Sequence, residues 1–99
     1  MTKKRDRLKI IYDIIKVIQR KNGFIKPTHI LYKSNLSHQM LDEYLKELIS
    51  KGFISENSTK SGKTYSVTQK GFDYLNQYKL IVDFIDSFGL GEFENTKLQ

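Results

Sequence analysis

The sequence predicts a mainly helical α+β domain, in which three helices, a β-hairpin and a long final helix follow one another. Apolar residues recur at helical spacing in several segments of the 99-residue chain. Between the last two helical segments, two short runs rich in β-branched and aromatic residues flank a polar turn that contains glycine. The length allows a single domain with a modest core, which an added interface would help to stabilise.

The first helix is expected over residues 6–21. Its apolar residues form two neighbouring stripes, one of Leu8, Ile11, Tyr12, Ile15 and Ile18, the other of Ile10, Ile14 and Val17. Two stripes indicate contact with more than one neighbouring element. Gly23 then ends the helix, because glycine readily adopts the left-handed conformation of a helix cap.

A short helix is expected over residues 27–33 and a longer one over residues 37–51, with Ser37 as its cap. Pro27 suits the first position of a helix, where its missing N–H costs nothing. Asn35 tolerates the left-handed conformation of a tight turn. The buried face of the longer helix is expected to consist of Met40, Leu41, Tyr44, Leu45, Leu48 and Ile49.

The hairpin is expected to have strands at residues 53–57 and 63–67, joined by a turn over residues 58–62. The last helix is expected over residues 69–88, after a Thr68 cap. Within it, Leu75, Tyr78, Val82 and Ile85 have the spacing of a coiled-coil seam. The chain is therefore divided into a domain at 6–68, a C-terminal dimerisation helix at 69–88 and a flexible tail at 89–99.

Composition favours a polyanionic partner and argues against catalysis. The chain has 17 Lys+Arg against 11 Asp+Glu, a net charge of +6 and a pI near 9.5. It has no cysteine, and His29 and His38 have no close carboxylate at ligand spacing, so neither a metal nor another cofactor is expected. Gly62-Lys63-Thr64 lacks the upstream glycine of a phosphate-binding loop, and no enzyme activity is expected. No run approaches the roughly 20 apolar residues of a membrane helix, which favours a cytoplasmic protein.

The order of elements is that of a winged helix-turn-helix, a fold most often used to bind DNA. Residues 26–54 (KPTHILYKSNLSHQMLDEYLKELISKGFI) and 64–75 (TYSVTQKGFDYL) resemble the small archaeal winged helix-turn-helix proteins. The resemblance rests on the turn at 32–37 and the strand-to-helix junction at 65–71, and it covers about residues 8–88. It implies a transcriptional regulator or DNA-organising protein, dimeric through a C-terminal helix.

The start of the helix at 37–51 is expected to enter the major groove of double-stranded DNA, where its first side chains reach base edges. Ser37, His38 and Gln39 lie at that end, and Gln39 can pair with adenine. Phosphate or minor-groove contacts are expected from the short helix and from the wing, residues 57–64, through Lys26, Thr28, Lys33, Lys60 and Lys63. Ordinary solvated polar residues are the alternative interpretation.

The apolar surplus of the last helix suits a homodimer interface, in either helix orientation, made by Tyr74, Tyr78, Ile81, Val82, Ile85 and Phe88. A second class of function stays open, because Asp42, Glu43 and Glu47 lie on the helix expected to contact DNA. These carboxylates repel phosphate and favour a protein-interaction module. The wing favours DNA, as does a basic N-terminal arm formed by Lys3, Lys4, Arg5 and Arg7.

Overall fold

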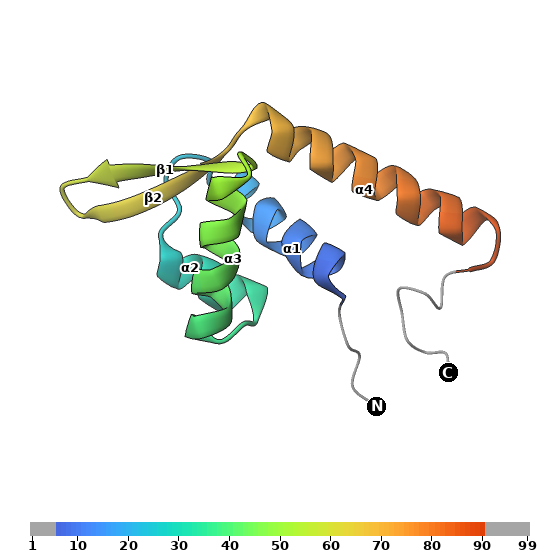
Figure 1. The fold of residues 1–99 in the computed structure, drawn as a ribbon, viewed down its shortest axis with the longest axis horizontal. Coiled ribbons are helices and arrows are strands. Elements are labelled where there is room, and N and C mark those ends of the chain that lie inside the picture. The colour runs from blue at the N-terminus through green and yellow to red at the C-terminus, as the bar shows by residue number, and fades with distance from the viewer. Residues whose placement is uncertain (1–5, 91–99) are drawn as a thin grey trace.

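The computed structural model describes residues 6–90, and its elements follow the expected order (Figure 1). They are α1 (Arg7–Arg20), α2 (Pro27–Ser34), α3 (His38–Ser50), β1 (Ile54–Thr59), β2 (Gly62–Val67) and α4 (Gln69–Ser87). The strands pair as an antiparallel two-stranded sheet. No helix within these residues is long and apolar enough to cross a membrane.

The helix ends follow the local chemistry of the chain. The side chains of Ser37 and Thr68 accept hydrogen bonds from backbone amides at the start of α3 and α4. Pro27 occupies the first turn of α2, which has no side-chain cap. Asn35 ends α2 in the left-handed conformation, with φ 57°, and this turn lets α3 follow after only a few residues.

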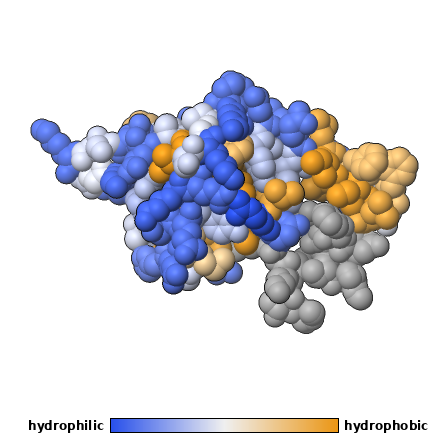
Figure 2. Space-filling view, in the orientation of Figure 1, coloured by the Kyte–Doolittle hydropathy of each residue, from blue (hydrophilic) through white to orange (hydrophobic). Residues whose placement is uncertain are grey.

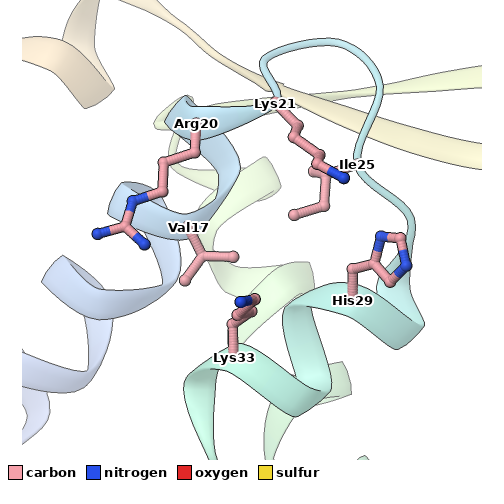
Figure 3. Close-up of a pocket in the computed structure, with 6 residues that line it drawn as sticks. All are labelled: Val17, Arg20, Lys21, Ile25, His29 and Lys33. Atoms are coloured by element: carbon pink, nitrogen blue, oxygen red, sulfur yellow. The ribbon is translucent and has the colours of Figure 1, made fainter.

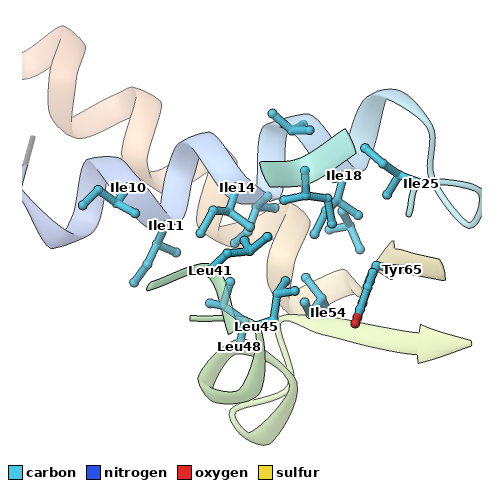
Figure 4. Close-up of a cluster of buried hydrophobic side chains, with 14 of the residues drawn as sticks. Ile10, Ile11, Ile14, Ile18, Ile25, Leu41, Leu45, Leu48, Ile54 and Tyr65 are labelled. Carbon is cyan, nitrogen blue, oxygen red and sulfur yellow. The ribbon is translucent and has the colours of Figure 1, made fainter. Parts of the chain in front are cut away.

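The core lies around α1, between the other helices and the base of the hairpin (Figure 4). Ile14, Ile15 and Ile18 are fully buried, so both apolar stripes of α1 are used, as predicted. Leu8 and Met40 were expected to be buried but are 50% and 40% exposed. Each lies in the first turn of its helix.

The hairpin turn is shorter than the sequence predicted. Thr59 pairs with Gly62, which leaves only Lys60 and Ser61 between the strands. Gly62 has φ +125°, a conformation that L side chains rarely adopt. The extra pairing satisfies backbone groups that a five-residue turn would leave to solvent, so the wing is a longer and more regular ribbon than expected.

The loop after α1 pairs with the edge of β2 that β1 does not use, so β2 lies between β1 and this loop. The amide of Gly23 donates to the carbonyl of Tyr65 at 2.9 Å, and the amide of Tyr65 donates to the carbonyl of Ile25 at 3.2 Å. The side-chain oxygen of Asn22 accepts a hydrogen bond from the amide of Val67 at 2.6 Å. These three bonds attach the base of the wing to the α1–α2 loop.

The first turn of α4 packs against the base of the hairpin at Gly71. A Cβ atom there would lie 2.3 Å from the carbonyl oxygen of Phe53 and 2.6 Å from Cγ1 of Val67. Only glycine permits this approach without movement of the backbone. Further along α4, Leu75 and Tyr78 are buried, and beyond them the helix extends away from the domain (Figure 1).

Candidate nucleic-acid interface

The three residues expected to meet base edges are exposed together at the start of α3. The oxygen of Ser37 accepts the amide of Met40 at 3.1 Å, so its hydroxyl proton is still available to a partner. The amide nitrogen of Gln39 lies 3.4 Å from Oε2 of Glu43, a long contact that a base could replace. His38 is exposed beside them.

Two of the three carboxylates on α3 are paired with cations of the same chain. Asp42 pairs with Lys46 at 3.1 Å. Glu47 pairs with Arg7 and, at 2.9 Å, with Lys51, and hydrogen bonds from these two cations lower the pKa of its carboxyl. The repulsion expected from this helix is therefore partly compensated within the molecule.

The two wing lysines differ in their surroundings. Lys60 is exposed in the two-residue turn and has no ion pair among residues 6–90. Lys63 reaches across the ribbon, where its Nζ lies 2.8 Å from Oε2 of Glu56, and this carboxylate raises the pKa of Lys63. The sequence did not single out Glu56, although the hairpin register places it diagonally opposite Lys63.

The residues in and before α2 that were expected to contact phosphates have different surroundings. Nζ of Lys26 donates to the carbonyl of Ser61 at 3.1 Å, which joins the start of α2 to the tip of the wing. Thr28 is exposed on α2. Lys33 lies instead beside a hollow between α1 and α2 (Figure 3).

Of the four residues of the basic arm, only Arg7 lies within the described part of the chain. Arg7 pairs with Glu47, and its guanidinium carbon lies 5.8 Å from the ring centroid of Tyr44, so this residue holds α1 against α3. Lys3, Lys4 and Arg5 lie outside the described residues. Within residues 6–90, no group of three histidine, aspartate or glutamate side chains is placed to hold a metal ion.

The six residues expected at a dimer interface differ in how much surface they expose. Tyr74 donates to the carbonyl of Leu8 at 2.6 Å, and Tyr78 is 7% exposed and stacks on Tyr12 with ring centroids 4.7 Å apart. These two tyrosines have little surface left for a second copy. Val82 and Ile85 are half-buried.

Other apolar residues are exposed on the last turns of α4 and at Phe88, directly after it, where Figure 2 shows hydrophobic surface. Ile81 and Phe88 are 51% and 66% exposed. Leu80 and Phe84, which the sequence analysis did not place at the interface, are each 60% exposed. We call Leu80, Ile81, Phe84 and Phe88 the α4 apolar strip.

Three helices, a wing formed by β1 and β2, and an exposed start of α3 define a winged-helix domain. The chain belongs to the winged helix-turn-helix family, whose profile matches residues 4–85. It is 33% identical over 79 residues to an uncharacterised protein of Methanocaldococcus jannaschii, covering 74% of this chain and 79% of that protein. Both the family and the fold class expected from the sequence are thus confirmed.

Solved structures agree at the level of the fold. Sso10a-2, described as a DNA-binding protein from Sulfolobus solfataricus, superposes with a TM-score of 0.70 at 19% identity and covers 85% of each chain. The multiple antibiotic-resistance repressor MarR of Listeria monocytogenes has a TM-score of 0.60 at 18% identity, over 79% of this chain and 58% of that chain. The fold is thus similar to that of transcription regulators.

Proposed function

We propose that this chain binds double-stranded DNA as a homodimer and acts in transcription regulation or in DNA organisation. The observation that carries the proposal is the exposed start of α3, where Ser37, His38 and Gln39 lie together, with Lys60 exposed on the wing and in no ion pair among residues 6–90. In this arrangement the residues at 37–51 occupy the major groove, and the wing at 57–64 follows the backbone or the minor groove.

The test is fluorescence anisotropy with a random-sequence duplex of about three helical turns, titrated from low to physiological salt. We expect micromolar or tighter binding that weakens steeply with salt, because phosphate contacts release counterions. Lys60→Gln should reduce the salt slope by about 2, roughly 1 for the wing of each protomer. Lys79→Gln, at an exposed lysine on α4, should leave the slope unchanged.

Absence of binding even at low salt would reject the DNA proposal. A protein-interaction module would then be the better interpretation, and a pull-down for partners would follow. Equal effects of Lys60→Gln and Lys79→Gln would show that only overall charge matters and would remove the wing from the interface.

The homodimer part of the proposal is supported by the α4 apolar strip. Its four large apolar side chains, three on α4 and Phe88 directly after it, are exposed where the helix extends beyond its own domain. Monomeric proteins rarely leave such surfaces uncovered. A second copy of the same helix covers this strip by symmetry. The second half of α4, rather than its whole length, is the surface available for this contact.

The dimer is tested by light scattering. Ile81→Glu with Phe84→Glu should give monomers, because a charge buried in an apolar interface is strongly unfavourable. Asn76→Glu, at an exposed polar position of the same helix, is the matched control and should stay dimeric. A parent protein that is already monomeric would refute the proposal.

A further inference from the structure

One of the three carboxylates on α3 differs from the other two in having no cation as a partner. Glu43 is exposed and forms no ion pair with any cation among residues 6–90. Lys46 is the one lysine of α3, and it pairs with Asp42. Arg7 lines the same surface recess as Glu43 but pairs with Glu47. Both of these neighbouring cations therefore belong to other carboxylates.

Glu43 lies on the side of α3 that points away from the core. Leu41, Leu45 and Leu48 are the members of the core on this helix (Figure 4). The amide nitrogen of Gln39 lies 3.4 Å from Oε2 of Glu43, so these two side chains share one surface. Exposed residues at helical spacing continue this surface along α3 as a stripe of Gln39, Glu43, Lys46 and Ser50. In a helix that enters the major groove, this is the side that meets the bases.

A carboxylate in the major groove favours some bases over others, because it accepts hydrogen bonds and has none to donate. Guanine and thymine present acceptor atoms to the groove, and these atoms repel a carboxylate. Adenine presents an amino group beside an acceptor nitrogen, whereas cytosine presents an amino group alone. The base that suits Glu43 best is therefore cytosine.

We propose that Glu43 reads a cytosine in the major groove and so gives the protein a sequence preference. This inference rests on the proposed function, because it concerns the same start of α3 in the DNA complex. Gln39, one helical turn earlier, pairs with an adenine of the same site. Four residues of a helix rise about 6 Å, less than two base-pair steps of about 3.4 Å. The two bases therefore lie no more than two base pairs apart.

The absence of a cation partner has an effect on binding to unrelated sequences. Phosphates repel a carboxylate wherever the bases offer it no donor, so Glu43 weakens non-specific binding. At a site that contains the cytosine, the amino group offsets this repulsion. An ion pair of Glu43 with Lys46 would weaken both effects, but Asp42 holds that lysine at 3.1 Å. Glu43 thus increases the ratio of specific to non-specific affinity while it lowers overall affinity.

The test starts with selection of bound duplexes by the full chain from a pool with a randomised centre. We expect the selected duplexes to share a cytosine no more than two base pairs from an adenine. Thymine presents an acceptor in place of the amino group of cytosine. Replacement of that cytosine by thymine should therefore weaken binding of the parent protein about five- to tenfold, the effect of one base contact.

Two variants assign the preference to Glu43. In Glu43→Gln, the same replacement should change affinity less than about twofold, because an amide can both donate and accept. Asp83→Asn removes the same charge from an exposed position on α4 and should keep the parent's preference. Affinity for a random-sequence duplex should rise more in Glu43→Gln than in Asp83→Asn, because only the first carboxylate lies close to phosphates in the complex.

Three results would overturn the role of Glu43. One is a parent protein that binds DNA without a preference for cytosine, and another is a preference that Glu43→Gln retains. The third is an equal loss of the preference in Asp83→Asn, which would assign the effect to net charge. In each of these cases the proposed DNA binding stands. If the parent binds no duplex even at low salt, the proposed function itself is wrong, and the reading of cytosine is wrong with it.

Discussion

Among the described glycines, Gly71 alone has other atoms within 4 Å of the position a Cβ would take. We expect Gly71→Ala to lower the free energy of unfolding by about 1–3 kcal/mol, the usual effect of overpacking, because the new methyl would contact the backbone carbonyl of Phe53. Denaturant unfolding monitored by circular dichroism measures the change. Asn76→Ala, on the exposed side of the same helix, is the control and should not destabilise. Equal stability of Gly71→Ala and the parent would contradict the packing described here.

In the proposed DNA complex, Glu56 would compete with phosphate for Lys63. We expect Glu56→Gln to raise DNA affinity about three- to tenfold, since it frees Lys63 and removes one carboxylate from the wing. Asp83→Asn removes the same charge from α4 and controls for net charge. Anisotropy titrations of both variants at one salt concentration make the comparison. Similar gains in the two variants would mean that the ion pair with Lys63 has no local effect.

At the scale of elements, the attachment of the wing to the α1–α2 loop depends on one side chain. Asn22→Ala leaves the partly buried amide of Val67 without its acceptor, so we expect a loss of about 1–3 kcal/mol in stability. Amide hydrogen exchange should quicken most at Val67 and Tyr65. Asn57→Ala, which loses only an exposed contact to Ser66 in the hairpin, is the matched control. Unchanged exchange at Val67 would show that the loop does not hold the wing.

The helices could be predicted from local patterns, whereas the pairing of the loop could not. Helices depend on residues close together in the chain, such as periodic apolar residues, Pro27 and the caps at Ser37 and Thr68. The bounds of α1 to α4 could therefore be predicted nearly correctly. The contact of Asn22 with Val67 spans 45 positions and leaves no local pattern. The spacing of apolar residues along α4 predicted Tyr78 at a dimer interface. That spacing cannot show that Tyr78 stacks on Tyr12 within the same chain.

The same contrast between local patterns and contacts of distant residues applies to the candidate site. The exposed start of α3 follows from the cap at Ser37 and the apolar face behind it, so its residues could be named in advance. The pairing of charges could not be predicted, because Lys63 and Glu56 meet only in the hairpin register.

For the whole molecule, stability should fall on the alkaline side. Burial raises the pKa of Tyr74 from 10.0 to about 12, so between these values the unfolded chain has lost a proton that the folded chain keeps. The unfolded state is then favoured as pH rises, and the free energy of unfolding decreases. Denaturant unfolding of the parent and of Tyr74→Phe across this range tests it. The variant should decline less steeply, though not be flat, because burial also raises the pKa of Tyr65.

The attachment of the wing at both ends has a consequence for binding. Its base is bonded to the loop at 22–25, and its tip is held by Lys26, at the start of the helix that leads into the turn before α3. A free hairpin would lose conformational entropy on settling into a groove, and association would be weaker by that amount. Here that ordering has already occurred during folding. In the proposed complex, the distance between the wing and α3 would be set by these bonds within the protein, and DNA whose grooves match that distance would bind with the least deformation.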